Sequence, residues 1–460
     1  MELRKYQIEL IEKTRSLLRA GKKSVLIQAP TGSGKTALTA YMLGRSSSKG
    51  VRSWFIVHRR ELIKQSCETF HRAGVQNGII AAGFDFDSNK LVHVCGVQTL
   101  LRRMDRFERP KLIVWDECHH LAAKTWKIIY EKYSDATHIG LSATPIRLDG
   151  KGLCDWFKDI VCGPSVSELI NQGWLSPFKI YAPKTPDLNG VHHLAGDFNK
   201  KEIENVMNKP TVTGDAIKEY VKLANGKRAI LRTVSIQHSM SVAEQFKLAG
   251  IPAKHIDGDT PSEERDSAMS AFRRGEILVI CFVDLFSEGL DIPGIEAAFD
   301  LRPTESLVLW MQFCGRALRP LEGKKVAIIC DLAGNVFRHG LPDEPREWTL
   351  EGRDKKKGSK STVRLCPSCF AAQPIFRTSC QFCGFTFPVI PREIAHQEGE
   401  LVEVNSDMVR RQMKKEQGRA QSLDDLVALG RARGYKHPYA WACFVFQARQ
   451  QKRFSAGRIA

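Results

Sequence analysis

Short apolar runs alternate with amphipathic stretches along the first 160 residues. Each run is four to five residues long and rich in β-branched or aromatic side chains, which is typical of a buried strand. The stretches between the runs favour helices, so the alternation predicts a parallel sheet covered by helices on both faces. The predicted strands are Val25–Gln28, Ser53–Val57, Gly78–Ala81, Leu91–Cys95, Leu112–Trp115 and Thr137–Leu141.

A second alternating set of strands and helices begins at Arg228 and continues to about residue 345. Residues 161–205, between the two sets, are rich in Gly, Pro and polar side chains and carry one predicted strand, Phe178–Tyr181. We therefore expect an α/β fold with two parallel-sheet lobes in tandem, at 1–160 and 206–345. The expected order beyond them is a linker at 346–361, a small zinc ribbon at 362–390 and a basic helical tail at 400–460.

A glycine-rich turn joins the first predicted strand to a helical stretch that begins near Ala37. Its glycines let the backbone point successive N–H groups at phosphate oxygens, and the helix N-terminus adds positive charge. We predict that Lys35 binds nucleotide phosphates and that the Thr36 hydroxyl ligates Mg²⁺. The alternative, a chance glycine turn, is disfavoured by the flanking strand and helix. The predicted nucleotide-binding residues are Ala29, Pro30, Thr31, Gly32, Ser33, Gly34, Lys35 and Thr36.

Two acidic residues follow the predicted strand Leu112–Trp115. Carboxylates at the rim of a sheet are costly to bury unless they meet a cation. We expect Asp116 to bind Mg²⁺, directly or through a water molecule. Glu117 would orient and deprotonate the water that attacks the terminal phosphate. Because functional residues collect at the carboxyl ends of parallel strands, both acids should lie near Lys35.

The segment Asp116-Glu117-Cys118-His119, with Ser142-Ala143-Thr144-Pro145, resembles motifs II and III of superfamily 2 DEAD/DEAH-type helicases and translocases. The resemblance covers residues 1 to about 345 and implies two RecA-like lobes with ATP between them. Arg4-Lys5-Tyr6-Gln7 resembles the upstream motif whose glutamine, here Gln7, reads adenine. The segments 58–62 and 96–100 resemble the nucleic-acid-facing motifs of the first lobe, which implies contacts from Arg59, Gln98 and Thr99.

The second predicted lobe carries the remaining motifs of this superfamily in the same order. Residues 230–238 match the place of the fourth motif, and the turn at 255–260 implies nucleic-acid contacts from Asp257 and Gly258. The segment 283–293 resembles motif V, which implies that Gly289 and Asp291 lie at the nucleotide. The segment 312–319 resembles motif VI.

The spacing within 312–319 would place Gln312, Arg316 and Arg319 on one face of a helix. Arginines that face the γ-phosphate from the other lobe would stabilise negative charge in the transition state. The alternative for an isolated helix is a surface with ordinary solvated arginines, and the upstream motifs argue against it.

Within the superfamily the chain is similar to the bacterial and phage RadD-like helicases. RNA-unwinding DEAD-box proteins usually carry Pro-Thr-Arg-Glu-Leu where this chain has His58-Arg59-Arg60-Glu61-Leu62, and Ala-Arg-Gly where it has Ser287-Glu288-Gly289. The segments 301–307, 331–335 and 339–342 add to the similarity. It implies DNA as the partner, whether single-stranded, branched or duplex, and a role in repair, recombination or replication together with proteins of those processes.

Composition and cysteine usage indicate the cellular compartment in which the chain is expected to work. Of its 460 residues 43% are apolar and 26% charged, no apolar run is long enough to span a membrane, and the start resembles no signal peptide. Nine of the 13 cysteines stand alone, which favours a reducing cytoplasm. We expect a cytoplasmic protein without a membrane partner, nucleoid-associated or phage-encoded in a bacterial cell.

Positive charge is concentrated near the end of the chain. The formal net charge is +18, and the segment 346–460 holds 21 Lys and Arg against 11 Asp and Glu. Such an excess favours a polyanionic partner, of which nucleic acid is the commonest. A basic surface that serves only solubility is the alternative.

Two Cys-x-x-Cys pairs lie in the expected ribbon, Cys366 with Cys369 and Cys380 with Cys383. Four thiolates at this spacing can bind Zn²⁺ tetrahedrally, whereas two structural disulfides, the alternative, do not suit a reducing compartment. Gly384 would permit a tight turn after the second pair. The aromatic residues expected to cover this small unit are Phe370, Phe376, Phe382, Phe385 and Phe387.

The tail is expected to hold a basic helix at 410–419 and a second helix at 422–430 that starts with Ser422 as N-cap and Asp425 three residues later. Aromatic residues further on are interleaved with cations and could stack on bases. They could equally form the core of a helical pair, and the sequence favours that alternative slightly. The aromatic residues are Tyr435, Tyr439, Trp441, Phe444 and Phe446.

The function expected from these patterns is ATP hydrolysis coupled to movement on DNA or to its unwinding, with ATP, Mg²⁺ and Zn²⁺ as cofactors. Three alternatives stay open, namely a duplex-DNA translocase that separates no strands, an RNA helicase, and a nucleic-acid-binding scaffold that ATP only switches.

Overall fold

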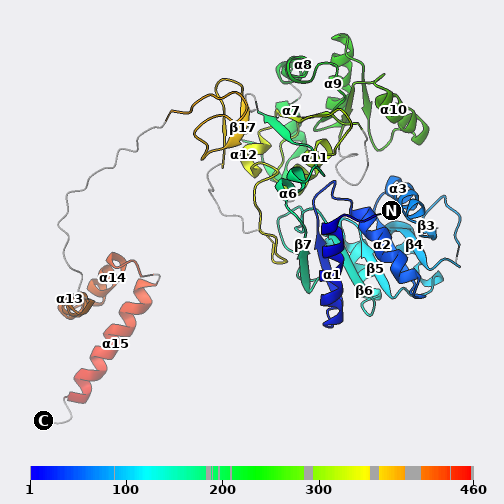
Figure 1. Cartoon of the computed structure of the whole chain (residues 1–460). Helices are drawn as coiled ribbons and strands as arrows, with labels where there is room; N and C mark the ends of the chain where they lie inside the picture. Colours follow the sequence, from blue (N-terminus) through cyan, green and yellow to red (C-terminus); the bar gives the residue numbers. More distant parts are fainter. Residues whose placement is uncertain are drawn as a thin grey trace. The chain divides into compact units, whose positions relative to one another are not determined.

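The computed structural model describes residues 2–87, 89–182, 188, 190–194, 197–207, 210–283, 294–352, 362–388, 406–435 and 437–456 (Figure 1). The chain divides into two compact units, Met1–Val389 and Ile390–Ala460. Among the described residues, the first unit holds two large sheets with their helices, and the second holds the C-terminal helices.

The first sheet has seven strands, all parallel, in the order β3-β4-β2-β5-β6-β1-β7. Six of these strands confirm the predicted ones to within a residue. The seventh, β7, was not predicted because it is a short, partly exposed edge strand with a polar first residue. The strands are β1 (Ser24–Gln28), β2 (Ser53–Val57), β3 (Asn77–Ile80), β4 (Val92–Gly96), β5 (Leu112–Trp115), β6 (Thr137–Ser142) and β7 (Asp159–Cys162).

Helices cover both faces of this sheet and bury separate cores. On one face lie α1 (Lys5–Arg19), α2 (Lys35–Ser47) and α3 (Arg60–Arg72), whose Leu10, Leu38 and Phe70 pack with strand residues. On the other face lie α4 (Val97–Arg103), the 3₁₀ turns η1 (Met104–Arg106) and η2 (Cys118–Ala122), and α5 (Lys124–Lys132). This two-sided covering explains why the central strands are mostly apolar and fully buried.

The second sheet has eight strands in the order β12-β13-β11-β14-β15-β8-β17-β16. Its first six strands are parallel, and two antiparallel strands follow at the far edge. The strands are β8 (Phe178–Tyr181), β11 (Ala229–Arg232), β12 (Ala253–Ile256), β13 (Val279–Phe282), β14 (Ala297–Asp300), β15 (Ala327–Asp331), β16 (Val363–Leu365) and β17 (Ala371–Pro374). The α/β fold with two tandem RecA-like lobes is thereby confirmed.

Helices also cover both faces of the second sheet. One core includes residues of α7 (Lys200–Met207), α8 (Pro210–Ala224) and α9 (Ile236–Leu248). On the opposite side, α10 (Ser262–Arg274), α11 (Leu307–Ala317) and α12 (Asn335–His339) share a core cluster with the first lobe. The chain segment that connects the two lobes in the sequence forms α6 (Val166–Asn171) and a small hairpin of β9 (His193–Leu194) and β10 (Asp197–Phe198).

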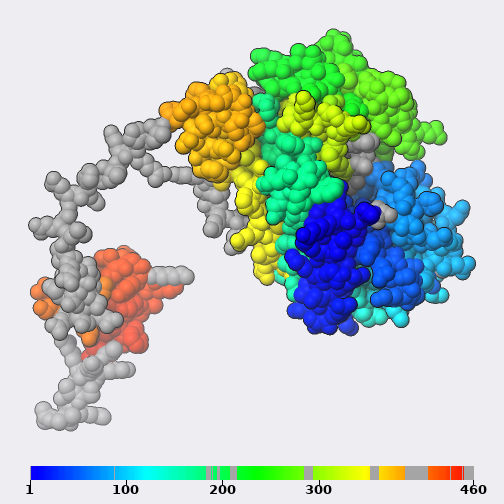
Figure 2. All heavy atoms as spheres, viewed as in Figure 1, coloured from blue at the N-terminus to red at the C-terminus, as the bar shows by residue number. Residues whose placement is uncertain are grey.

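The expected ribbon is joined to the second lobe through its strands. β17 pairs with β8, with Ala371 opposite Tyr181 and Ala372 opposite Ile180, so the ribbon extends the second sheet. Figure 2 shows the ribbon packed against the second lobe. Strand Phe178–Tyr181, predicted in the connection between the lobes, therefore lies inside the second sheet between β15 and β17.

The described part of the C-terminal unit contains α13 (Ser406–Arg419), α14 (Leu423–Ala432) and α15 (Pro438–Ala456). Ser422 caps α14 and Asp425 completes the capping box, as predicted. Trp441 and Phe446 pack on a small core around Leu426, which favours the helical-pair alternative for these two aromatics. Tyr439 and Phe444 are instead 63% and 73% exposed. Over the described residues, no helix is long and apolar enough to cross a membrane.

Candidate functional site

The glycine-rich turn between β1 and α2 has the backbone that its sequence predicts. Gly32 and Gly34 have φ of +86° and +79°, a left-handed conformation that side chains rarely adopt. A Cβ on Gly32 would lie 2.9 Å from Leu175, and one on Gly34 would lie 2.8 Å from the Gln7 amide. Both positions therefore need glycine, for their conformation and for their close packing.

Gln7 and Tyr6 hold this turn from α1. The Gln7 amide donates to the carbonyl oxygens of Ser33 and Gly34, at 3.0 and 3.3 Å, and the Tyr6 hydroxyl donates to the Ser33 carbonyl at 2.6 Å. The upstream motif thus contacts the phosphate-binding turn directly. That Gln7 reads adenine stays a prediction.

Lys35 lies at the start of α2, between the turn and the acidic pair. Its Nζ donates to the Ala29 carbonyl at 3.3 Å and lies 3.7 Å from a Glu117 carboxylate oxygen. The predicted meeting of Lys35 with the acidic pair is therefore present in the structure. The ammonium group lies where it could also bind a phosphate oxygen.

Glu117 has an unusual backbone. Its φ of 46° is left-handed, which is rare for a residue with a side chain and costs on the order of 1–3 kcal/mol. The side chain is 5% exposed, and its second oxygen lies 3.5 Å from His119 Nδ1. Such strain is often found at active sites, since the surrounding fold holds a side chain in a position that function requires.

Asp116 is partly buried next to Glu117, and this environment disfavours a second negative charge. Burial, followed by the charge of Glu117, raises the pKa of Asp116 to about 6, although Lys35 acts in the opposite direction. A divalent cation at this carboxylate would offset both effects. The donor set, which is Asp116 with the Thr36 hydroxyl on the same cavity, therefore fits Mg²⁺.

The second lobe contributes Gln312, Arg316 and Arg319 to the same cavity. The three residues do not share one helical face as expected, because α11 ends at Ala317 and only the first two lie on it. Pro320 follows Arg319 and disfavours a helical conformation there. Burial lowers the pKa of Arg319 to about 10, so the group stays charged at neutral pH. Arg319 therefore lines the same cavity as Gln312 and Arg316 without sharing a helical face with them.

Gln312 is 2% exposed, and neither atom of its amide has a hydrogen-bond partner among the described residues. Buried polar groups without partners are rare. The turn and α11 also touch, because a Cβ on Gly315 would lie 2.5 Å from the Thr31 Cβ. The glycine-rich turn, the acidic pair and the arginines thus surround one cavity of about 610 Å³, which is large enough for a nucleotide.

Comparison with known proteins agrees with this arrangement. Residues 1–147 match the family of the type III restriction enzyme res subunit, and residues 213–320 match the helicase conserved C-terminal domain. The chain belongs to the superfamily 2 helicases. It is an ATP-hydrolysing enzyme that acts as a nucleic-acid helicase or translocase.

Two relatives of this helicase and one solved structure show how far the similarity extends. The chain is 38% identical to a 51.5 kDa protein of Lactococcus phage (isolate 7-9), over 84% of this chain and 83% of that one. It is 30% identical to IRC3 of Saccharomyces cerevisiae, proposed to be an ATP-dependent helicase, over 72% of this chain but only 51% of IRC3. A fragment of a proposed HsdR subunit from Vibrio vulnificus has the same fold, with a TM-score of 0.59, 19% identity and coverage of 76% and 67%.

The predicted nucleic-acid contacts of this helicase come from both lobes. Gln98 and Thr99 lie in the first turn of α4, whereas Arg59, Asp257 and Gly258 lie outside helices and strands. Gln98 and Gly258 are exposed, whereas Thr99 accepts a hydrogen bond from the Ala82 amide and Arg59 donates to the His58 ring. The Asp257 carboxylate accepts from Thr260 and lies 3.1 Å from His255 Nε2, so it shapes its own turn. Contacts of these five residues with nucleic acid stay predictions.

Some of the predicted site lies outside the described residues. The segment 284–293, which includes Gly289 and Asp291 of the predicted motif V, is among them. Residues 353–361 of the predicted linker at 346–361 also lie outside the described residues.

The four predicted cysteine ligands meet in the ribbon. The sulfur atoms of Cys366, Cys369, Cys380 and Cys383 all lie within 4.8 Å of one another. Gly384 has the left-handed backbone expected after the second pair, and Phe370 has it after the first. Phe382, Phe385 and Phe387 pack around the cluster, but Phe370 and Phe376 are 48% and 79% exposed, which corrects the expected shell.

Sequence reasoning missed Arg265 of α10. It forms an ion pair with Glu61 of α3 and donates to the Gly258 and Thr260 carbonyls, at 3.3 and 2.9 Å. Arg265 thereby joins the predicted nucleic-acid motifs of the two lobes. Arg265 lies among charged residues at the start of α10, and this sequence gives no signal that its side chain is buried and bound to the other lobe.

Proposed function

We propose that this helicase hydrolyses Mg²⁺-bound ATP in the cavity between its lobes and uses the energy to move along DNA or unwind it. The observation that carries the proposal is that a single cavity is lined by Lys35, Glu117 and Arg316, which come from three separate motifs and both lobes. A phosphate-binding turn alone would support binding, whereas this combination supports hydrolysis.

Each group has a separate role in the proposed reaction. Lys35 and the N–H groups of the turn bind the β- and γ-phosphates, while Thr36 and Asp116 would hold Mg²⁺, which neutralises charge on the phosphates when bound. Glu117 accepts a proton from the attacking water, and its strained backbone fixes the carboxylate for that task. Gln312 would help to orient this water. Arg316 and Arg319 would stabilise the charge of the transition state.

Coupling to nucleic acid follows from the position of the arginines in the second lobe. A strand bound across Arg59, Gln98 and Thr99 of the first lobe and Asp257 and Gly258 of the second would favour the closed arrangement, and closure would complete the ATP site. A ligand shifts such an equilibrium only through its different affinity for the two arrangements.

DNA is the proposed partner because the first-lobe motif, with His58-Arg59-Arg60 in place of Pro-Thr-Arg, resembles the RadD-like branch. The first-lobe family description, a restriction-enzyme subunit, favours the same substrate. The proposed context is repair, recombination or replication in a bacterial cell or during phage infection, and a phage relative supports it.

Zinc is the proposed ligand of the cysteine cluster. At a Zn–S distance of about 2.3 Å, tetrahedral geometry separates the sulfur atoms by roughly 3.8 Å. The pairs Cys366–Cys383 and Cys369–Cys380 lie 3.5 and 3.7 Å apart, close to that value. The metal would hold together a ribbon that has only a small core of its own.

The test of the proposed function is the ATPase rate with single-stranded DNA, duplex DNA, forked DNA and RNA, each compared with Glu117→Gln. Stimulation by DNA above RNA is expected. Equal or greater stimulation by RNA would contradict the DNA assignment, and phosphate release no faster than in Glu117→Gln would leave only an ATP-switched scaffold.

A duplex-DNA translocase is the second candidate, because nothing in the described residues identifies an element that separates strands. Strand displacement on forked DNA, measured beside triplex displacement on duplex DNA, decides between the two. Triplex displacement without strand separation would establish the translocase.

A further inference from the structure

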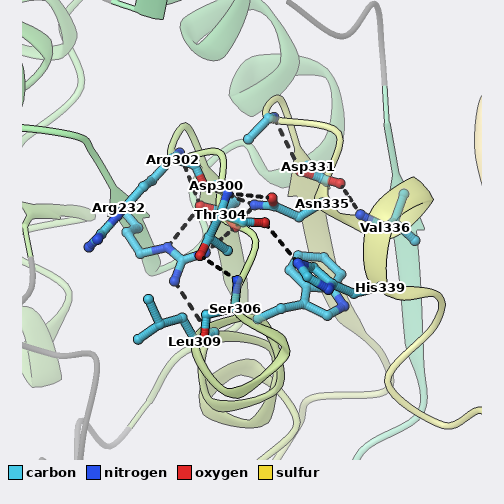
Figure 3. A network of polar contacts seen from close by, with 12 residues as sticks. Arg232, Asp300, Arg302, Thr304, Ser306, Leu309, Asp331, Asn335, Val336 and His339 are labelled. Carbon is cyan, nitrogen blue, oxygen red and sulfur yellow. Dashed lines mark hydrogen bonds and ion pairs between the residues drawn. The ribbon is translucent and has the colours of Figure 1, made fainter. Parts of the chain in front are cut away.

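A largely buried polar network lies at the carboxyl ends of three neighbouring strands in the second lobe (Figure 3). Arg232 ends β11, Asp300 ends β14 and Asp331 ends β15. The Arg232 guanidinium binds the Asp300 carboxylate through two hydrogen bonds, of 2.9 and 2.5 Å. Both side chains are at most 1% exposed. A buried ion pair contributes little net stability on average. We therefore ask whether this pair holds neighbouring segments in a fixed position.

Asn335, the first residue of α12, links this ion pair to the segment that leads into α11. Its amide nitrogen donates to Asp300 at 2.9 Å and to the Arg302 carbonyl at 2.8 Å. Its amide oxygen accepts from the backbone N–H of Thr304 at 2.9 Å. Asn335 is 0% exposed, and Arg338 donates a further bond to the same oxygen at 3.1 Å. Every hydrogen-bonding position of the amide group is thus used.

Asp331 and His339 fix α12 itself in relation to this segment. The Asp331 carboxylate accepts from the backbone N–H of Val336 at 2.7 Å and of Ala333 at 3.1 Å. The His339 Nε2 donates to the Thr304 carbonyl at 2.8 Å. Thr304 is therefore held at its N–H and at its carbonyl by two residues of the same short helix (Figure 3).

The same network reaches the body of α11. Arg232 donates to the Leu309 carbonyl at 3.2 Å, and its guanidinium lies 4.6 Å from the centre of the Phe313 ring. The Trp310 indole donates to the Gly340 carbonyl at 3.1 Å. α11 carries Gln312 and Arg316, which line the nucleotide cavity. The network therefore fixes the N-terminal half of the helix that supplies these two residues.

We propose that Asn335 is a positioning residue for ATP hydrolysis, which holds α11 through Thr304 so that Arg316 faces the nucleotide. The inference rests on the proposed function, in which Arg316 acts at the transition state. Asn335 itself does not line the cavity, and the phosphate-binding turn belongs to the first lobe. The effect of losing Asn335 should therefore fall on kcat and not on the binding of ATP.

The first experiment compares the steady-state ATPase of the full chain with that of Asn335→Ala. A fall in kcat of about 10-fold or more is expected, with KM for ATP unchanged within about twofold. A catalytic group displaced by about 1 Å can lower the rate by roughly two orders of magnitude. Val242→Ala is the matched control, since Val242 is 0% exposed in the core on the opposite face of the same sheet. Equal losses of kcat in the two variants, at equal loss of thermal stability, would overturn the proposal.

The second experiment asks whether Asn335 acts through Arg316. In a double-mutant cycle of Asn335→Ala and Arg316→Ala, the double variant should have nearly the kcat of Arg316→Ala alone. Once the Arg316 guanidinium is removed, Asn335 no longer has that group to position. Losses that multiply would overturn the proposal. An Arg316→Ala variant with the parental kcat would instead overturn the proposed role of Arg316, so the two failures are distinguishable.

Discussion

Arg265 on α10 forms an ion pair with Glu61 on α3 and so joins the second lobe to the first. The pair is partly shielded from water, since the two side chains are 10% and 31% exposed. Glu61 belongs to the predicted nucleic-acid motif that includes Arg59, and Arg265 also holds the turn that includes Gly258. This contact should therefore contribute to lobe closure on nucleic acid.

Reversing the charge at one end of this pair should weaken the stimulation of ATPase by DNA. Glu61→Arg is expected to lower it about threefold to tenfold, as two like charges would meet, and the exchange Glu61→Arg with Arg265→Glu should recover part of the loss. The measurement is the ratio of the ATPase rate with DNA to the rate without DNA. If the loss of stimulation in the double variant equals the two single losses combined, attraction between these two residues plays no part.

Replacing the proposed base separates ATP binding from hydrolysis. Glu117→Gln should retain ATP affinity, because the turn and Lys35 are intact, while turnover falls by about 100-fold or more. Lys35→Ala should instead weaken nucleotide binding itself. Equilibrium titration with a fluorescent nucleotide, beside a phosphate-release assay, checks both variants. Turnover of Glu117→Gln close to the parental rate would show that another group accepts the proton.

The first lobe should lose stability in mild acid through His138. Burial lowers the pKa of His138 from 6.5 to about 4, and the neutral ring accepts from Trp115 and donates to the Tyr133 carbonyl, both at 3.0 Å. Because the unfolded chain binds the proton more readily, the stability is complete above pH 6.5 and is lost as the pH falls toward 4. The loss is about 1.4 kcal/mol per pH unit within that window.

Urea unfolding at pH 7 and pH 5, followed by tryptophan fluorescence, measures this loss. His138→Gln stays neutral over the range and should have a smaller difference between the two pH values. Burial also lowers the pKa of His238 in the second lobe to about 4, so some acid sensitivity should remain. An unchanged difference in His138→Gln would assign the acid sensitivity to other groups.

Loss of the cysteine cluster should destabilise the second lobe as well as the ribbon. Cys380→Ser is expected to release zinc and to loosen β17, which pairs with β8 in the second sheet. Each kcal/mol lost lowers Tm by about 2–4 °C for a unit of this size. Cys154→Ser, at an exposed cysteine outside the cluster, is the control. Zinc content and Tm are measured on both, and a zinc-free Cys380→Ser with parental Tm would contradict the coupling.

Periodicity predicted most of the fold because the central parallel strands, such as Ser24–Gln28 and Leu112–Trp115, are buried on both faces. The meeting of Lys35 with Glu117 could also be predicted, since strand ends converge at one edge of a sheet. Arg319 was misplaced because the proline after it ends the helix early. The bonds of Asn335 and Arg265 could not be found in this way, because they depend on how distant segments pack and not on any local pattern.

Pairing of β17 with β8 has a consequence for how the protein is made. During synthesis the second sheet emerges with β8 as an open edge, and Ala371 appears only long after its partner Tyr181. An open edge is a template for association with other chains, and β17 closes it. If metal is needed to shape the ribbon, then zinc shortage during expression should lead to aggregation of the whole helicase and not merely to a missing module.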